Sequence, residues 1–221
     1  MKKILCIIVS GLIALTSPDI SAQQKNSLEK FYQQLEDAYY SFSCSYTLKP
    51  SGNASSFGKV TGQAQVEMQD EAYIFKGNGL AIVSDGQALC LIDESSKEAV
   101  LESVPETLSE ADYLQNPAYL IRGLSDNFKV EKASSAKDDK GTRISDNYVL
   151  IPTVNCGISR CKLTLPVQNA GLSSAVFELS DGTVLEVSIY DNKFQPKKSD
   201  SYFAIRQPSS FDKAWVVTDL R

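Results

Sequence analysis

The stretch Leu80-Ala-Ile-Val-Ser-Asp-Gly-Gln-Ala-Leu-Cys-Leu-Ile-Asp93 has the composition of a complete β-hairpin. Asp85 and Gly86 tolerate the positive φ angles of a two-residue type I′ turn, and aliphatic residues flank them on both sides. With such a turn, Ser84 is expected to face Gln87. The strands before and after the turn then pair residue by residue.

This register predicts that Ile82 faces Leu89 and that Leu80 faces Leu91. Because partners across a ladder share a face, the four aliphatic side chains gather on one side of the sheet. The opposite side is apolar as well, with Ala81, Val83, Ala88, Cys90 and Ile92. The sheet is therefore expected to be covered on both faces, and one of the covers could be a ligand.

The N-terminus resembles a secretory signal peptide. Lys2 and Lys3 precede an apolar run over residues 4–15, and the small residues Ser21 and Ala22 follow. The apolar run is too short to span a bilayer. We therefore expect residues 1–22 to be a signal peptide cleaved near Ala22, and residues 23–221 to form one soluble domain in the periplasm.

Charge and composition exclude several classes of function. The chain has a formal net charge of −5, which repels nucleic acid, and it contains no histidine. The lack of histidine removes Ser-His-Asp and Cys-His nucleophilic sites and histidine-ligated metals. The carboxylate pairs Asp70-Glu71, Asp93-Glu94 and Asp138-Asp139 are expected in turns or loops, where solvated acids are common. We therefore expect that the protein is not an enzyme and that it has no metal or cofactor site. We expect a monomer that binds its ligand.

Four cysteines remain after the signal peptide, without a Cys-x-x-Cys motif. Cys156 and Cys161 flank a loop of four residues that a disulfide could close in an oxidising compartment, although thiols are also compatible with this spacing. Cys44 and Cys90 lie in apolar strand patterns and are expected to be buried.

The pattern of apolar residues predicts one long helix and a large antiparallel sheet. Ser27 is a suitable N-cap for a helix over residues 27–41, and alternating strands follow from Phe42. Residues 107–123 contain two helical patches broken by Asn116-Pro117, and residues 134–142 form a polar loop. About ten strands are expected, including one over residues 202–206, and such a sheet must curl or split.

The order of these elements resembles the LolA family of periplasmic outer-membrane lipoprotein carriers. The similarity covers nearly all of the mature chain. Its motifs are Tyr73-Ile-Phe75, the hairpin Leu80 to Asp93, Asn116-Pro-Ala-Tyr-Leu-Ile121 and Tyr202-Phe-Ala-Ile-Arg-Gln-Pro208. The family commonly has a lid-latching arginine one residue before the aromatic pair, where this chain has Ala72, and an aromatic residue where it has Cys90.

The resemblance implies an α+β fold in which a curved antiparallel sheet forms an incomplete barrel, with helices over its concave face. It also implies acylated lipoproteins as cargo, loading by an inner-membrane transporter and release to an outer-membrane acceptor. The acyl chains would lie in a cavity lined by Tyr73, Phe75, Leu80, Ile82, Leu89, Leu91 and Leu120.

Two alternatives stay open at the level of sequence. The same apolar residues could form an ordinary core under the helix over residues 27–41. A protein of similar half-barrel shape could also be an envelope sensor or regulatory protein that binds a partner. In the carrier, the segment from Asn116 to Gly123 is expected to form a movable lid.

Overall fold

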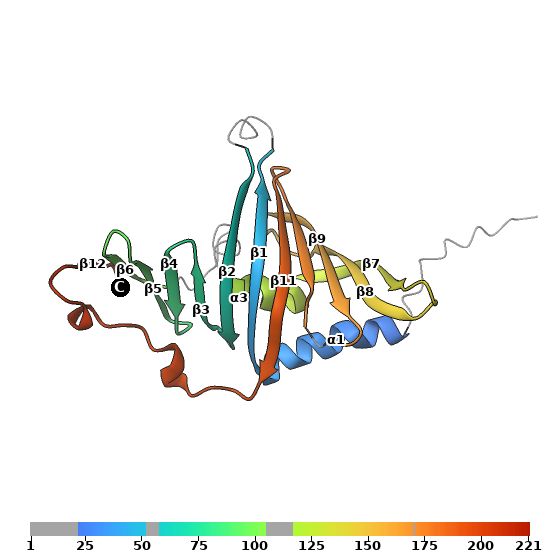
Figure 1. Cartoon of the computed structure of the whole chain (residues 1–221), viewed down its shortest axis with the longest axis horizontal. Helices are drawn as coiled ribbons and strands as arrows, with labels where there is room; N and C mark the ends of the chain where they lie inside the picture. The colour runs from blue at the N-terminus through green and yellow to red at the C-terminus, as the bar shows by residue number, and fades with distance from the viewer. Residues whose placement is uncertain (1–21, 52–57, 105–116, 170) are drawn as a thin grey trace, which may run out of the picture.

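The computed structural model describes residues 22–51, 58–104, 117–169 and 171–221. These residues form a single twelve-stranded sheet that is curved and not closed, with helices against its inner face (Figure 1). The order of the strands is β12-β6-β5-β4-β3-β2-β1-β11-β10-β9-β8-β7. This arrangement confirms the expected α+β incomplete barrel. Residues 1–21 of the predicted signal peptide lie outside the described residues, as do residues 107–116 of the predicted helical patches.

The strands are antiparallel except for the pair β12 and β6, which is parallel. Strands that are neighbours in the sheet are also consecutive in the chain, apart from the pairs β1 with β11 and β6 with β12. The strands are β1 (Tyr39–Lys49), β2 (Val60–Gln69), β3 (Ala72–Gly77), β4 (Leu80–Ser84), β5 (Ala88–Asp93), β6 (Glu98–Ser103), β7 (Phe128–Lys137), β8 (Arg143–Pro152), β9 (Ile158–Pro166), β10 (Ser174–Leu179), β11 (Val184–Gln195) and β12 (Val216–Asp219).

Among the described residues, two α-helices lie on the inner face of the sheet, where α1 contacts β7 and α3 contacts β2, β3 and β7 (Figure 1). Helix α1 (Ala22–Asp37) buries Leu28, Phe31 and Leu35, which recur at steps of three and four residues. Helix α3 (Pro117–Asp126) begins at its proline, as expected, but continues beyond Gly123.

The predicted N-cap role of Ser27 is wrong, because α1 starts five residues earlier. The hydroxyl of Ser27 instead donates a hydrogen bond of 2.6 Å to Asp146 on β8. Asp146 also accepts hydrogen bonds from Ser135 and Arg143, and its side chain is buried. This polar cluster fastens the N-terminal half of α1 to the strands β7 and β8.

The hairpin of β4 and β5 forms, but its predicted register is wrong by two residues. Ile82 faces Leu91 and Ser84 faces Leu89, so the loop is longer than two residues. The reason is the side chain of Asp85, which accepts hydrogen bonds from the backbone amides of Gln87 and Ala88 and stabilises the wider turn. A shift of two residues leaves each side chain on its predicted face.

Two local predictions outside the hairpin are also wrong. Strand β7 continues to Lys137, so only residues 138–142 form the turn where a longer polar loop was expected. Residues 200–203 form a 3₁₀ helix in place of part of the strand expected over residues 202–206. A further 3₁₀ helix spans Pro208–Ser210.

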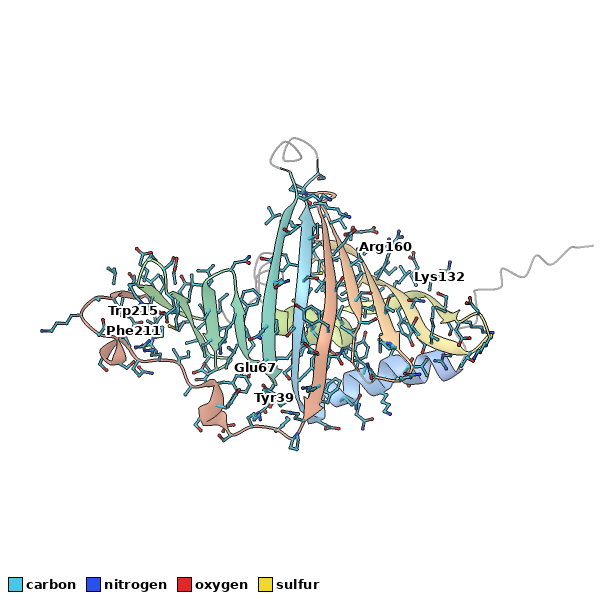
Figure 2. All side chains as sticks on the ribbon, viewed as in Figure 1. Tyr39, Glu67, Lys132, Arg160, Phe211 and Trp215 are labelled. Atoms are coloured by element: carbon cyan, nitrogen blue, oxygen red, sulfur yellow. The ribbon has the colours of Figure 1, made fainter. Side chains whose placement is uncertain are left out.

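The C-terminal segment (residues 196–221) covers the outer face of β5 and β6 (Figure 2). Its Ile205, Phe211 and Trp215 pack with Cys90 and Leu101 in a second, smaller core. The outer cover of the hairpin is therefore part of the chain itself. Only the inner face of the same strands is left for a ligand.

The beginning of the C-terminal segment is held by aromatic and charged side chains. The hydroxyls of Tyr39 and Tyr202 both donate hydrogen bonds to the carboxylate of Glu67 on β2. The ammonium group of Lys198 lies 4.8 Å from the centre of the Tyr39 ring. Burial and the bond to Glu67 raise the pKa of Tyr39, so its hydroxyl stays protonated and continues to donate.

Candidate functional site

The inner face of the sheet encloses an apolar cavity of about 270 Å³ beneath α3. Its volume is near the lower limit of ligand pockets in proteins, which is roughly 300 Å³. The lining residues come from β1 to β4, β10, β11, α3 and the segment before β10. They are Phe42, Cys44, Tyr46, Val66, Phe75, Ile82, Leu120, Ile121, Leu124, Leu172, Ala175, Phe177, Leu185, Val187 and Ile189.

The strand residues of this lining occupy matching positions in the ladders. Val66 faces Phe75, and Phe75 in turn faces Ile82, so β2, β3 and β4 contribute one continuous row. On the other side of β1, Ala175 of β10 faces Val187 of β11. Because alternate residues point to the same face, these strands line the cavity with every second side chain.

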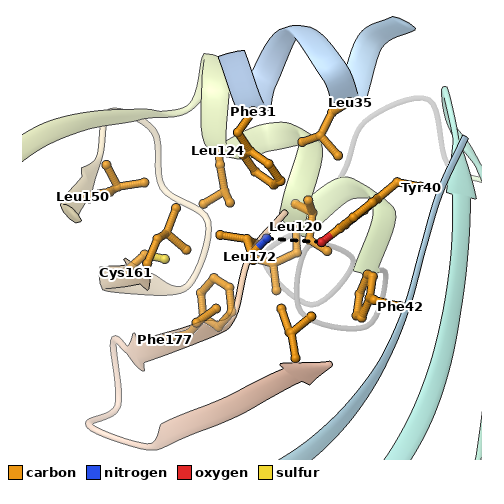
Figure 3. Close-up of a cluster of buried hydrophobic side chains, with 14 of the residues drawn as sticks. Phe31, Leu35, Tyr40, Phe42, Leu120, Leu124, Leu150, Cys161, Leu172 and Phe177 are labelled. Atoms are coloured by element: carbon orange, nitrogen blue, oxygen red, sulfur yellow. Dashed lines mark hydrogen bonds between the residues drawn. The ribbon is translucent and has the colours of Figure 1, made fainter. Parts of the chain in front are cut away.

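Helix α3 closes the cavity with Leu120, Ile121 and Leu124. Phe31 and Leu35 of α1 lie behind this helix (Figure 3). Movement of α3 would therefore uncover the lining.

The end of the cavity next to α1 is filled with side chains. Tyr40 is fully buried, its ring stacks on Phe194 at 4.4 Å, and its hydroxyl accepts a hydrogen bond of 3.4 Å from the backbone amide of Leu172 (Figure 3). Burial raises the pKa of Tyr40, so the hydroxyl is neutral.

The described lining contains no charged residue. Burial also raises the pKa of the Cys44 thiol, which is therefore neutral. The hydroxyl of Tyr46 supplies the sole side-chain oxygen among the described lining residues. Such a surface favours a hydrocarbon chain.

An arginine of α3 connects this helix to its surroundings. Arg122 donates a hydrogen bond of 2.8 Å to the backbone carbonyl of Leu35 in α1, and the same nitrogen lies 3.5 Å from Asp70 in the turn between β2 and β3. Ala72, at the position where the LolA family commonly has a latching arginine, is close to Asp70 in the chain. A guanidinium thus reaches this region from the helix and not from the strand.

Three of the seven predicted cavity residues line the cavity, namely Phe75, Ile82 and Leu120. The other four share the inner face of the sheet but lie outside the lining. Tyr73 is buried in the core, Leu80 is 39% exposed, and Leu89 and Leu91 are half-buried on β5.

Most of the lining comes from strands outside the predicted site. Phe42, Cys44 and Tyr46 of β1 form an alternating pattern in the sequence, but the pattern alone does not say which core they face. Leu185, Val187 and Ile189 of β11 show the same alternation. Only the pairing of β1 with β11 brings the two sets together.

Cys156 and Cys161 are both buried in the main core. Burial raises the pKa of Cys161 far above its usual value. A disulfide between these two residues stays a prediction.

In the part of the chain that the structure describes, no group of three or more histidine, cysteine, aspartate or glutamate side chains is arranged to hold a metal ion. None of its helices combines the length and apolarity that are needed to cross a membrane.

No family model and no curated protein matches the sequence. Among solved structures, an uncharacterized conserved protein from Thermus thermophilus superposes with a TM-score of 0.51 at 9% identity, covering 89% of this chain and 99% of that protein. At this identity, the similarity concerns the fold.

Two other structures superpose less closely. A LolA superfamily protein from Nitrosomonas europaea has a TM-score of 0.41 at 15% identity, covering 82% of this chain and 97% of that one. Lipoprotein LppX from Mycobacterium tuberculosis has a TM-score of 0.40 at 10% identity, with coverages of 81% and 99%. With its open antiparallel sheet and helices on the inner face, the chain has a LolA-like fold.

Proposed function

We propose that this protein is a carrier of the cell envelope that binds the acyl chains of lipoproteins and moves them toward the outer membrane. The observation that supports the proposal most strongly is the cavity between the sheet and α3, which is lined by apolar side chains and not filled by them. A sensor that used the same half-barrel only to bind a partner would have no need of this space.

The physical chemistry of acyl chains supports the same role. Each methylene group buried away from water contributes about 0.8 kcal/mol, so an acylated protein needs an apolar shield to cross an aqueous compartment. A lining without charges provides such a shield with little selectivity for the protein attached to the chain. Binding and release would then require movement of α3, and no chemical step.

The proposed function also implies a location and partners for this protein. The predicted signal peptide would place the mature chain in the periplasm, where cargo would be received from an inner-membrane transporter and delivered to an outer-membrane acceptor. The protein would act as a monomer, because one chain encloses the whole cavity.

Native mass spectrometry of the protein purified from its own periplasm tests this function. Co-purified acylated lipoprotein is the expected result, and binding of a fluorescent fatty acid should be saturable. If the protein binds no acyl ligand in either experiment and instead co-purifies with a non-acylated partner, the sensor is the better assignment.

A matched pair of variants on β10 tests whether the acyl ligand binds in the cavity. Ala175 points into the cavity, and its neighbour Val176 points to the outer face. We expect Ala175→Phe to fill the cavity and abolish binding, whereas Val176→Phe should bind normally. Equal binding by the two folded variants would place the ligand elsewhere.

A further inference from the structure

We propose that Tyr46 donates a hydrogen bond to the carbonyl group at the head of a bound acyl chain. The chain would lie with its carbonyl at the turn between β3 and β4 and its methyl end toward α1. This inference rests on the proposed function, since it concerns how the same cavity orients its ligand.

The two ends of the cavity differ along β1. Phe42, Cys44 and Tyr46 line it in order, and the position before them, Tyr40, is fully buried against α1. The other end is more open, because Tyr46 is only half-buried and the adjacent turn residue Asn78 is exposed. A chain with a bulky polar head can therefore place only its methyl end next to Tyr40.

The hydroxyl of Tyr46 is held in position at the open end. The side-chain amide of Asn78 donates a hydrogen bond to it. This bond uses the oxygen as an acceptor, and it is the one hydrogen bond of this hydroxyl within the described residues, so the phenolic proton is available for a ligand. Asn78 has a φ of 53°, a backbone conformation that asparagine tolerates better than most residues.

Glycine on the neighbouring strand makes room for this arrangement. Tyr46 faces Gly62 of β2 directly, and a Cβ atom at position 62 would overlap the hydroxyl and the end of the ring. The ring of Tyr46 thus lies across the glycine, so the strand pairing and the Asn78 amide together determine where the hydroxyl points.

The chemistry of the lining indicates the kind of group that Tyr46 recognises. Among the described lining residues, all side chains except Tyr46 and Cys44 are pure hydrocarbon. An ester or amide carbonyl is the acceptor that every protein- or glycerol-linked acyl chain carries at its head. The shared ligand is thus an acyl carbonyl followed by an alkyl chain, from either a lipoprotein or a phospholipid.

The variant Tyr46→Phe removes the donor and keeps the ring. We would measure its affinity for an ester-linked lysophosphatidylcholine and for the ether-linked analogue with the same chain, which lacks the carbonyl. The variant should bind the ester about threefold to tenfold more weakly, as expected for one neutral hydrogen bond, and bind the ether like the wild type. Tyr190→Phe, at an exposed tyrosine of β11, is the control and should change neither affinity.

A diacylated cysteine peptide forms a second arm of this experiment. It carries the same ester carbonyls on a peptide, so its affinity relative to the lysolipid tells which source the site prefers. In both arms, equal binding of wild type and Tyr46→Phe would overturn the inference, as would an equal loss for ester and ether. If wild-type protein bound none of these ligands, the proposed function itself would fail.

Photo-crosslinking provides a readout that does not require the variant. A lysolipid with a diazirine beside the ester should label β1 near Tyr46, and one with a diazirine at the chain end should label residues near Leu124 of α3. The reverse pattern would overturn the proposed orientation.

Discussion

The contact of Arg122 with α1 is expected to control how easily α3 opens. Arg122→Met keeps most of the aliphatic stem and removes the guanidinium that reaches the carbonyl of Leu35. The carbonyl of Leu35 then loses its donor from α3. We expect α3 to separate from the sheet more often in this variant, with little change in the sheet itself.

The magnitude follows from the exposure of the groups. A hydrogen bond from a charged donor contributes about 1.5 to 3 kcal/mol when buried, but the Arg122 side chain is 25% exposed, which favours the lower value. The 3.5 Å contact with Asp70 adds less than about 1 kcal/mol, because Asp70 is 55% exposed. The Nε atom of Arg122 is buried without a hydrogen-bond partner among the described residues, which offsets part of the gain.

A loss of about 1.4 kcal/mol corresponds to a tenfold change in an equilibrium constant. Hydrogen exchange followed by mass spectrometry should therefore show roughly tenfold faster exchange over Pro117–Asp126 in Arg122→Met. Lys197→Met is the matched control, since Lys197 contacts Asp70 at 2.7 Å, as Arg122 does, but lies in the C-terminal segment. In the wild type, α3 should exchange faster than the hairpin Leu80 to Asp93, and an added lipid should slow it.

Two results would refute the reasoning. Unchanged exchange of α3 in Arg122→Met would mean that the guanidinium does not hold the helix. Faster exchange of the hairpin and α3 to the same extent would mean that the variant weakens the whole fold and that α3 is no separate lid.

Three further predictions follow from the site and the core. Ile82→Glu places an unpaired carboxylate in the cavity and should weaken fatty-acid binding at least tenfold. Leu89 lies outside the lining, so Leu89→Glu should weaken binding less. Equal weakening by both variants would contradict the assigned lining. Burial alone would raise the pKa of Asp146, but hydrogen bonds from neighbouring side chains outweigh burial and lower the pKa in the folded state. The ionised Asp146 therefore stabilises the fold above the unfolded-state pKa of about 3.9, and this stabilisation is lost as the pH falls through the lower folded-state pKa. In thermal melts, Asp146→Asn should thus be less stable than the wild type at pH 7 and should lose less stability than the wild type on acidification. If the stability of both proteins changed with pH in the same way, Asp146 would not have this role. Non-reducing peptide mapping of periplasmic protein should find Cys156 linked to Cys161, and recovery of both as alkylated thiols would end that prediction.

Much of the secondary structure could be predicted because it depends on neighbours in the chain. The alternation in residues 80–93 assigned the strands and the face of each side chain. The pairing of Ile82 with Leu91 in place of Leu89 could not be predicted, because the hydrogen bonds of Asp85 widen the turn. An error of two residues in register moves a side chain along the strand and leaves it on the same face.

The N-terminus of α1 shows a different limit of the local pattern. Ser27 has the residue type of an N-cap, yet it is used inside the helix to bind Asp146, which is 119 residues away in the chain. A local preference of about 1 kcal/mol for capping is easily exceeded by the need to satisfy a buried carboxylate. No signal within residues 22–37 could reveal this partner.

The sequence by itself determined the apolar faces, the absence of histidine chemistry and the order of elements that resembles the LolA family. Only the tertiary structure decided that the C-terminal segment covers the outer face of β5 and β6, that Arg122 reaches α1 from α3, and that β1 and β11 line the cavity together. The physical reason is that periodicity reports the two faces of one strand, whereas a cavity arises from contacts between strands far apart in the chain. Those contacts depend on packing and closure of the whole sheet, which no local stretch of sequence encodes.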